Sequence, residues 1–226
     1  MKPEIIKINL QEKLHSIKAN NPFEDFAYLR AMEESNSASE KSGWIPEHIG
    51  EIKNKKLISF MPLYKKFNSY GEFIFDHQWA NALQRTGRSY YPKLLTAIPF
   101  TPCEGDRILA DNEQSKLSLI DAGIKKMETE KIESWHVLFP NEACKTVLKE
   151  KGFVERFNYR FTWVNENFED FDNFLSIFTS RQRATIRKER KGIAKQGIKF
   201  VCKQHDEITT EDWDLFHVFY QKTYYE

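Results

Sequence analysis

The alternation of strand-like and helix-like segments over residues 93–164 constrains the fold more than any other feature of this sequence. The strand-like segments are short and either apolar or alternating, and the helix-like ones have apolar residues three or four positions apart. Strand, helix, strand, helix and strand in succession predict an α/β (α+β) fold, with a mixed sheet flanked by helices. The segments are KLLTAIPF (93–100), SKLSLIDAGIKKMETEK (115–131), ESWHVLF (133–139), Pro140-Asn141 to Gly152, and FVERFNYRFTWV (153–164).

The residues before this pattern predict further short elements. Pro22 follows Asn21, as is typical of the first turn of a helix, and Asn54-Lys55-Lys56 separates two apolar segments as a hairpin turn would. Gly87 is suited to end a helix. The predicted elements are a strand over 4–9, a helix from 22, hairpin strands over 48–53 and 57–64, an extended segment over 70–76 and a helix over 77–87.

The pattern changes after Val164, where helical spacing predominates. We therefore predict an N-terminal domain over 1–165 and, over 166–226, a helical connection followed by the start of an incomplete second domain. The predicted elements of this part are a helix over 168–178, a helix over 181–196 capped by Ser180, a strand over 198–202 and a helix from 213 that is still in progress at Glu226.

A strongly basic segment lies in this C-terminal part, although the chain has a net charge of only +1. Residues 176–203 carry nine basic side chains and one acidic side chain. Arg183, Arg187 and Arg190 are three or four positions apart and share one helix face. They are candidates to bind the phosphates of a nucleotide-linked precursor, a tRNA acceptor end or an acidic lipid. The alternative is a solvated helix that pairs with the acidic stretch 204–214.

Composition and motif content exclude several classes of protein. Hydrophobic residues make up 40% and aromatic residues 14% of the chain, which excludes disorder over its whole length. No apolar run approaches the ~20 residues of a membrane-spanning helix, and the N-terminal sequence lacks the apolar core of a signal peptide. Three cysteines without a CxxC pair argue against a disulfide framework, and the histidines lack metal-ligand spacing. We therefore expect a cytoplasmic protein without a bound metal.

Several strings resemble one bacterial family. LKEKGFVERFNYRFTWV, in which Lys-Gly-Phe leads into a long strand, is similar to the end of a GNAT-type acyltransferase domain. From Asn21 onward, nearly the whole chain resembles the FemAB-like family, which is associated with peptidoglycan biosynthesis/recognition. The strings that carry this resemblance are NPFEDFAYLRAMEESNS, GWIPEHI, PLYKKFNSYGEFIFDHQWANALQRTGRSYYPKLLTAIPFTPCEGDRIL and SRQRATIRKER.

This resemblance implies tandem GNAT-like domains and an acyl- or aminoacyltransferase that acts on an amine of a peptidoglycan precursor. The acyl donor that the resemblance implies is acyl-CoA or aminoacyl-tRNA. GNAT domains that bind acyl-CoA hold its pyrophosphate on a glycine-rich turn, whereas the equivalent loop here has Gly105 between Glu104 and Asp106. Two carboxylates would repel a pyrophosphate, which favours an ordinary loop. Members of the family usually extend beyond this chain, so we expect the second GNAT-like domain to be incomplete.

The candidate catalytic residues are grouped in the string SYGEFIFD. Glu72 or Asp76 would act as a general base on the attacking amine if burial raised the pKa of its carboxyl, with Tyr70 beside it. The alternative is a strand whose outward face is polar.

Candidate substrate-binding residues flank this group. Lys65 precedes it, and Tyr91 and Lys93 follow in a Tyr-Tyr-Pro-Lys string that would line the entrance to a cleft, although such strings are as often structural corners. Arg107 is suited to bind a carboxylate or phosphate through two N–H groups. His136 is interpreted as a packed histidine rather than a catalyst.

These residues leave three functional hypotheses open. The first is the transferase just described, with the arginines of the basic helix anchoring phosphates. The second is a non-catalytic module that recognises an anionic cell-wall precursor or a partner protein through the same helix. The third is an incomplete chain in which exposed aromatic residues, such as Trp213 and Phe216, promote self-association.

Overall fold

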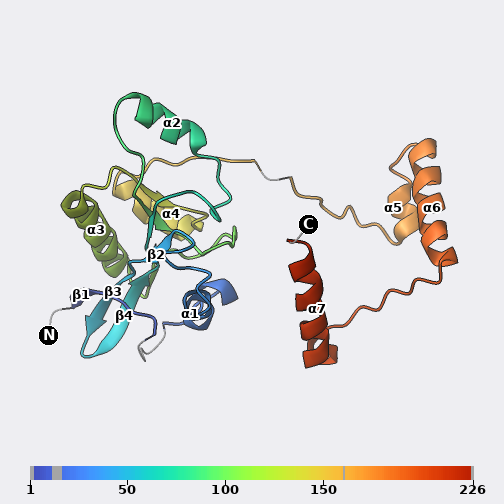
Figure 1. The fold of residues 1–226 in the computed structure, drawn as a ribbon, viewed down its shortest axis with the longest axis horizontal. Coiled ribbons are helices and arrows are strands. Elements are labelled where there is room, and N and C mark those ends of the chain that lie inside the picture. The colour runs from blue at the N-terminus through green and yellow to red at the C-terminus, as the bar shows by residue number, and fades with distance from the viewer. Residues whose placement is uncertain (1–2, 12–16, 160, 225–226) are drawn as a thin grey trace. The chain divides into compact units, whose positions relative to one another are not determined.

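The computed structural model describes residues 3–11, 17–159 and 161–224. The chain divides into two compact units, residues 1–157 (unit 1) and residues 158–226 (unit 2). All strands found in the described residues lie in unit 1, whereas the elements of unit 2 are helical (Figure 1).

The first sheet of unit 1 is antiparallel throughout, with the strand order β1-β3-β4-β7. Its centre is the predicted hairpin, whose turn residues Asn54 and Lys55 have φ values of 51° and 61°. Two successive left-handed residues match the twist of a two-residue hairpin turn, and asparagine tolerates this conformation better than most residues. The strands are β1 (Glu4–Lys7), β3 (Ile49–Lys53), β4 (Lys56–Met61) and β7 (Leu109–Ala110).

The second sheet is mixed, with the strand order β2-β5-β6-β8. β5 pairs antiparallel with β2 and β6, whereas β6 and β8 are parallel. A parallel pair needs a long crossover, and this one contains the 18-residue helix α3 (Glu113–Glu130). The mixed sheet and its helices confirm the predicted α/β (α+β) fold class. The strands are β2 (Trp44–Pro46), β5 (Tyr64–Lys66), β6 (Lys93–Thr96) and β8 (Trp135–Val137).

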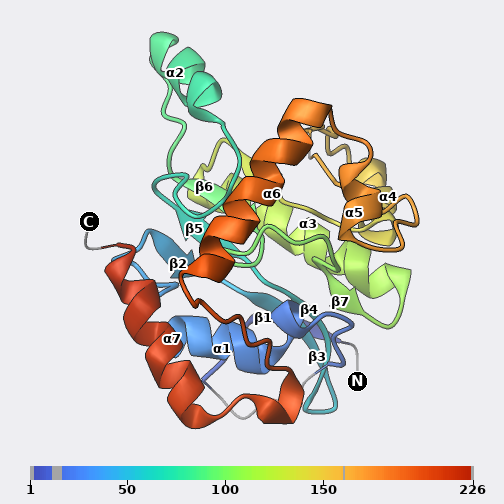
Figure 2. The ribbon, with the colours of Figure 1, turned by 90° about the vertical axis from the view of Figure 1, so that its right-hand side faces the viewer.

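Three helices of unit 1 begin at a residue whose side chain accepts a backbone hydrogen bond from the first turn. These capping residues are Asp25, Asn112 and Asn141. A short 3-10 turn, Pro22–Glu24, takes the place of the helix start predicted at Pro22, and α1 begins at Phe26. Helix α2 has no buried residue and stands apart from the sheets in both views (Figure 1 and Figure 2). The helices are α1 (Phe26–Glu34), α2 (His77–Arg85), α3 and α4 (Glu142–Glu150).

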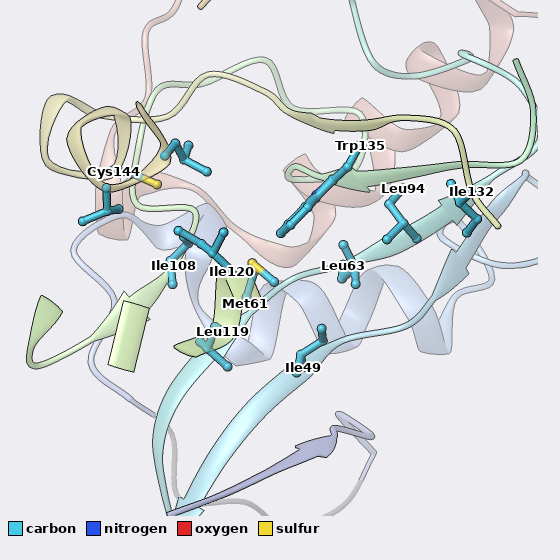
Figure 3. Close-up of a cluster of buried hydrophobic side chains, with 12 residues drawn as sticks. Ile49, Met61, Leu63, Leu94, Ile108, Leu119, Ile120, Ile132, Trp135 and Cys144 are labelled. Carbon is cyan, nitrogen blue, oxygen red and sulfur yellow. The ribbon is translucent and has the colours of Figure 1, made fainter. Parts of the chain in front are cut away.

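A cluster of buried apolar side chains lies between α3, α4 and the sheets (Figure 3). The ring of Trp135 packs so closely on α3 that a Cβ added at Gly123 would lie 2.4 Å from it. The indole N–H of Trp135 donates to Thr96 Oγ1 at 3.1 Å, which holds the ring in this position. Labelled members of the cluster are Ile49, Met61, Leu63, Leu94, Ile108, Leu119, Ile120, Ile132, Trp135 and Cys144.

Unit 2 exposes most of its side chains. Leu175 is its one buried residue among the described positions. The second helix of this unit begins after Thr179 rather than after Ser180, because Thr179 and Gln182 form a capping box. None of the helices in the described part of the chain has the length and apolarity needed to cross a membrane. The helices are α5 (Phe171–Leu175), α6 (Ser180–Lys195) and α7 (Thr210–Lys222).

Three predicted extended segments are wrong. Residues 153–164, apart from position 160, which lies outside the described residues, form no strand, and neither do residues 198–202. Phe157 and Phe161 are 84% and 101% exposed, so their alternation with polar residues matches no buried face. A strand must satisfy its backbone groups on a neighbour, and neither sheet pairs with these segments. Residues 70–76 form a loop. The carboxylates of Glu72 and Asp76 turn inward from this loop toward the buried side chains of Lys66 and Lys93.

Candidate active site

Two buried lysines lie side by side at the centre of the mixed sheet. Lys66 at the end of β5 and Lys93 at the start of β6 are directly opposite each other in the antiparallel register. Both residues are 0% exposed. Like charges at opposed positions of a sheet destabilise it, so this pair requires anionic partners close by.

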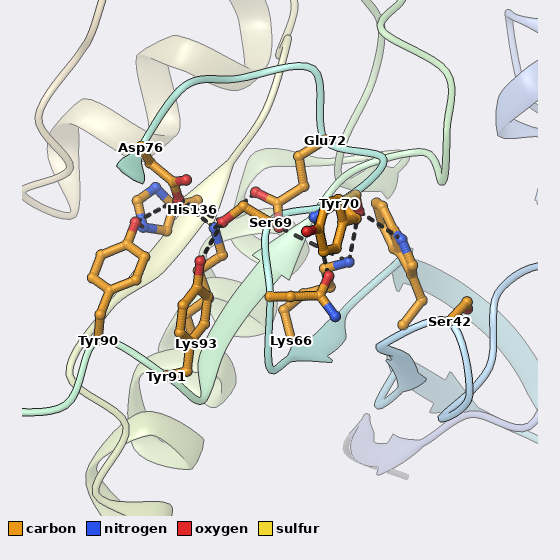
Figure 4. Close-up of polar contacts among 12 residues, drawn as sticks. Ser42, Lys66, Ser69, Tyr70, Glu72, Asp76, Tyr90, Tyr91, Lys93 and His136 are labelled. Carbon is orange, nitrogen blue, oxygen red and sulfur yellow. Dashed lines mark hydrogen bonds and ion pairs between the residues drawn. The ribbon is translucent and has the colours of Figure 1, made fainter. Parts of the chain in front are cut away.

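The partners are two carboxylates from the loop that follows β5. Lys93 Nζ donates to Glu72 Oε2 at 2.8 Å, to Asp76 Oδ2 at 2.6 Å and to Ser69 Oγ at 2.8 Å (Figure 4). An ammonium group has three N–H donors, so the Lys93 side chain is fully satisfied. The side chains of Lys93, Glu72 and Asp76 are all 0% exposed. The loop residues 67–76, called the 67–76 segment below, therefore cover the lysines and neutralise them.

Asp76 is the firmly ionised member of this cluster. Its Oδ2 atom also accepts hydrogen bonds from Tyr90 Oη at 2.7 Å and from Ser69 Oγ at 3.0 Å. Burial alone would raise the pKa of Asp76, but the hydrogen bonds from Lys93 and Tyr90 outweigh it and lower the pKa to about 2. Asp76 is thus suited to hold Lys93 in place and poorly suited to accept a proton.

Glu72 has the opposite character. Burial raises its pKa, although the charges of Lys93 and Lys66 act in the other direction. Its Oε1 atom has no hydrogen-bond partner among the described residues and lies 4.0 Å from Lys66 Nζ. A buried carboxyl with a raised pKa and an unused oxygen is suited to exchange a proton with a ligand. Asp76 Oδ1 also lacks a hydrogen-bond partner among the described residues, so the opposite pKa shifts are what distinguish the two predicted carboxylates and favour Glu72 as the base.

Lys66 is a member of the cluster that the sequence analysis missed. Its ammonium group lies 3.8 Å above the Trp44 ring and donates to the Tyr70 carbonyl oxygen at 3.0 Å. Burial lowers the pKa of Lys66 to about 8, and Glu72 opposes this shift. The predicted residue was its neighbour Lys65, which pairs with Glu130 of α3 instead. Side chains alternate across a strand, so neighbouring lysines must face opposite ways, and the direction of burial decides which one enters the site.

Tyr90, Tyr91 and His136 extend the network at the Asp76 end. Tyr91 Oη lies 2.8 Å from Ser69 Oγ, and Tyr90 Oη lies 3.0 Å from His136 Nε2. Burial and the nearby Lys93 charge lower the pKa of His136 to about 4, so its ring is neutral near pH 7. Because the one hydroxyl proton of Tyr90 is donated to Asp76, we assign the ring proton to Nε2, which then donates to Tyr90. His136 is thus both packed and part of the polar network.

Tyr70 contributes its backbone rather than its side chain. Its carbonyl oxygen accepts from Lys66 and, at 3.1 Å, from Trp44 Nε1. The residue is 76% exposed, so the hydroxyl predicted to assist the carboxylates does not join the buried cluster.

Arg107 lies in a different buried site. Its guanidinium donates to the carbonyl oxygens of Leu138, at 2.8 Å, and Cys103, and Nη1 lies 3.5 Å from Glu24 Oε1. Gly105 belongs to the same loop, and a Cβ added there would lie 1.7 Å from Glu24 Oε1. The space beside this loop is therefore filled by the side chains of Arg107 and of Glu24, which belongs to the Pro22–Glu24 turn, and Arg107 holds the loop to the strand end at Leu138.

The three predicted phosphate-binding arginines of unit 2 share one face of α6, and this face contacts α5. Arg183 donates to the Phe178 carbonyl oxygen at 2.6 Å, Arg187 pairs with Asp172 at 2.7 Å, and the Arg190 guanidinium lies 4.0 Å over the Phe171 ring. The Arg187 and Arg190 contacts join α5 to α6, and the Arg183 contact holds the turn between them. In the described part of the chain, no group of three or more His, Cys, Asp or Glu side chains is arranged to hold a metal ion.

Comparisons with known proteins identify the family. No curated protein sequence matches the chain. Among solved structures, a ribosomal-protein-alanine N-acetyltransferase from Brucella melitensis biovar Abortus 2308 is similar over 73% of this chain and 99% of its own, with 12% identity and a TM-score of 0.36. The family model named FemAB-like, described as peptidoglycan biosynthesis/recognition, matches residues 4–226. The chain therefore belongs to the FemAB-like family of peptidoglycan biosynthesis/recognition.

Proposed function

We propose that this chain belongs to an acyl- or aminoacyltransferase that acts on an amine of a peptidoglycan precursor. Membership of the FemAB-like family supports this reaction class. Aminoacyl-tRNA is the donor we favour over acyl-CoA, because Glu104 and Asp106 flank Gly105 where a GNAT domain would hold a pyrophosphate. Three cysteines without a CxxC pair favour a reducing, cytoplasmic setting for the reaction.

One observation supports the assignment of Glu72 as the general base. Its carboxyl combines a raised pKa with an oxygen that has no hydrogen-bond partner among the described residues. Asp76 also has an unpartnered oxygen, Oδ1, but its carboxyl is held ionised by Lys93 and Tyr90. We assign Asp76 to holding Lys93 in place, and Glu72 to the proton transfer.

The proposed reaction is a direct transfer. The amine nitrogen of the acceptor attacks the acyl carbonyl carbon, so a C–N bond forms and the C–O bond of an aminoacyl ester, or the C–S bond of a thioester, breaks. The nitrogen loses a proton to Glu72, and that proton leaves with the ribose hydroxyl or the thiol. The Glu72 side chain is 0% exposed, so the acceptor reaches it only when the 67–76 segment moves.

The experiment that tests this proposal compares two buried glutamates. Full-length chain is incubated with a labelled aminoacyl-tRNA, or an acyl-CoA, and a nucleotide-linked muropeptide, and the acylated product is measured by mass spectrometry. The variant Glu72→Gln should lower kcat by roughly 10²–10⁴-fold, the usual contribution of a general base. Glu51→Gln is the matched control, since Glu51 is also buried but accepts from Ser59 in the other sheet. Product from Glu72→Gln at the wild-type rate would show that Glu72 is not the base.

A binding module without catalysis is the second candidate, and the complete burial of the four charged groups favours it. Lys66, Glu72, Asp76 and Lys93 are closed off from solvent, so the cluster would then serve only to shape a recognition surface. No product with any donor, together with saturable binding of the muropeptide, would support this module and rule out the transferase.

A further inference from the structure

The lysine pair of the mixed sheet has an unusual electrostatic requirement. Lys66 and Lys93 occupy opposed positions on β5 and β6, and both are fully buried. Two ammonium groups in a dehydrated sheet need an anion that contacts both, since repulsion is least screened where water is excluded. The position between the two ammonium groups is therefore suited to hold an anion.

Glu72 fills this position incompletely. Its Oε2 atom is 2.8 Å from Lys93 Nζ, but its Oε1 atom is 4.0 Å from Lys66 Nζ. Lys66 makes one hydrogen bond, to the Tyr70 carbonyl oxygen, among the described residues, so two of its three N–H donors have no protein acceptor there. Unused donors on Lys66 thus face an unused acceptor on Glu72, which indicates an exchangeable contact.

The 67–76 segment that carries Glu72 is held mainly by polar contacts. Its aromatic side chains point outward, with Tyr70, Phe73 and Phe75 at 76%, 57% and 83% exposure. Phe73 has a φ of 56°, a left-handed conformation that is strained for a residue with a Cβ. Ile74, which is partly buried, packs against the core cluster around Trp44. The segment therefore gains little from apolar burial beyond Ile74 and depends on its carboxylates for attachment.

We propose that the Lys66–Lys93 pair is the binding site for an oxyanion of the substrate, a carboxylate or a phosphate, and that Glu72 is the internal anion it displaces. The ligand takes the N–H groups of the two lysines, and the 67–76 segment detaches around Glu72 while Asp76 stays on Lys93. The displaced Glu72 carboxyl is then available to the acceptor amine. This last step rests on the proposed function, whereas the anion site itself does not.

The test measures anion binding at equilibrium without any acyl donor. Full-length ¹⁵N-labelled chain is titrated at constant ionic strength with inorganic phosphate and, separately, with acetate. The readout is the indole N–H signal of Trp44, because that group donates to the Tyr70 carbonyl oxygen of the 67–76 segment. Glu72→Gln should bind phosphate at least about tenfold more tightly than wild type, since an intramolecular competitor at high effective concentration has been removed. Tighter binding of phosphate than of acetate assigns the site to a phosphorylated substrate, and the reverse order assigns it to a carboxylate.

Three further variants decide the outcome. Glu51→Gln should bind phosphate as wild type does, because that glutamate lies in the other sheet. The double variant Lys66→Met/Glu72→Gln should lose the increase in phosphate affinity that Glu72→Gln alone produces. Glu72→Asp keeps the charge but shortens its reach, so it should show a smaller gain even if Glu72→Gln folds poorly. Equal phosphate affinity in wild type, Glu72→Gln and Glu72→Asp would overturn the proposal. So would a double variant Lys66→Met/Glu72→Gln that binds phosphate as tightly as Glu72→Gln does. If turnover depends on Glu72 but phosphate affinity does not change in these variants, the transferase proposal is supported and the anion-site proposal is refuted.

Discussion

Replacing Lys93 by methionine should destabilise unit 1 by about 3–5 kcal/mol, the usual cost of leaving buried charges without their partner. The methionine side chain has nearly the same length, so the loss is electrostatic rather than a cavity. One part of this figure follows from Asp76, whose pKa falls from 3.8 to about 2 in the folded chain. That shift corresponds to about 2 kcal/mol of stabilisation at neutral pH. Lys93 supplies part of it, beside Tyr90 and Ser69, and the loss of the Glu72 contact adds to the Lys93 share.

The acid dependence gives this prediction a second readout. Because the folded pKa of Asp76 is depressed, its stabilising contribution is present above its unfolded pKa near 3.8 and is lost as the pH falls toward about 2. Glu72 has the opposite sign, since its raised pKa lets the folded chain take up a proton first. Without Lys93 both carboxyls should have raised pKa values, so Lys93→Met should lose less stability in acid than wild type does.

The assay is urea unfolding at several pH values, followed through the Trp44 indole signal so that only unit 1 is observed. Lys65→Met is the control, because Lys65 makes a partly exposed ion pair with Glu130 and should cost no more than about 1 kcal/mol. If Lys93→Met unfolds within about 1 kcal/mol of wild type at neutral pH and has the same acid dependence, the cluster is not an ionised pair network and the reasoning is refuted.

Two further predictions concern packing and protonation. Gly123→Ala should destabilise unit 1 by about 1–2 kcal/mol in thermal unfolding, because overpacking against Trp135 outweighs the gain in helix propensity. A Cβ added at Gly192 meets no atom within 4 Å, so Gly192→Ala should instead stabilise α6 and raise its helicity. If both substitutions stabilised their helices, the packing of Trp135 on Gly123 would be contradicted. His136 should titrate in NMR spectra near its pKa of about 4, and its contribution to stability should decline as the pH falls below the unfolded value of 6.5 toward that pKa; a midpoint near 6.5 would contradict its burial.

Elements with local end signals were predictable from the sequence, and elements that depend on a distant partner were not. The Asn54 turn and the helix that Asn112 caps depend on neighbouring residues, and both lie close to the predicted positions. Residues 153–164 have the alternation of a strand, but alternation does not supply a pairing edge. Residues 70–76 were predicted to be extended, yet two lysines outside the segment draw its carboxylates inward.

The candidate site was predictable in part for the same reason. Glu72, Asp76, Tyr91 and Lys93 were selected by residue type, and the structure brings these four together. Lys66 was missed because only the direction in which β5 is buried distinguishes it from its neighbour. The arginines of α6 contact α5 and the turn that follows it, and helical spacing does not reveal such contacts; their binding of phosphates stays a prediction.

The opposed lysines also constrain the order in which unit 1 is assembled. Pairing of β5 with β6 closes the chain between Lys66 and Lys93, and the carboxylates that neutralise these lysines lie inside that closed stretch. Strands that paired before the stretch was in place would bring two ammonium groups together as water is expelled. Pairing and neutralisation should therefore occur as one cooperative event, and this part of the sheet should form late, after the hairpin of the first sheet, which carries no such penalty.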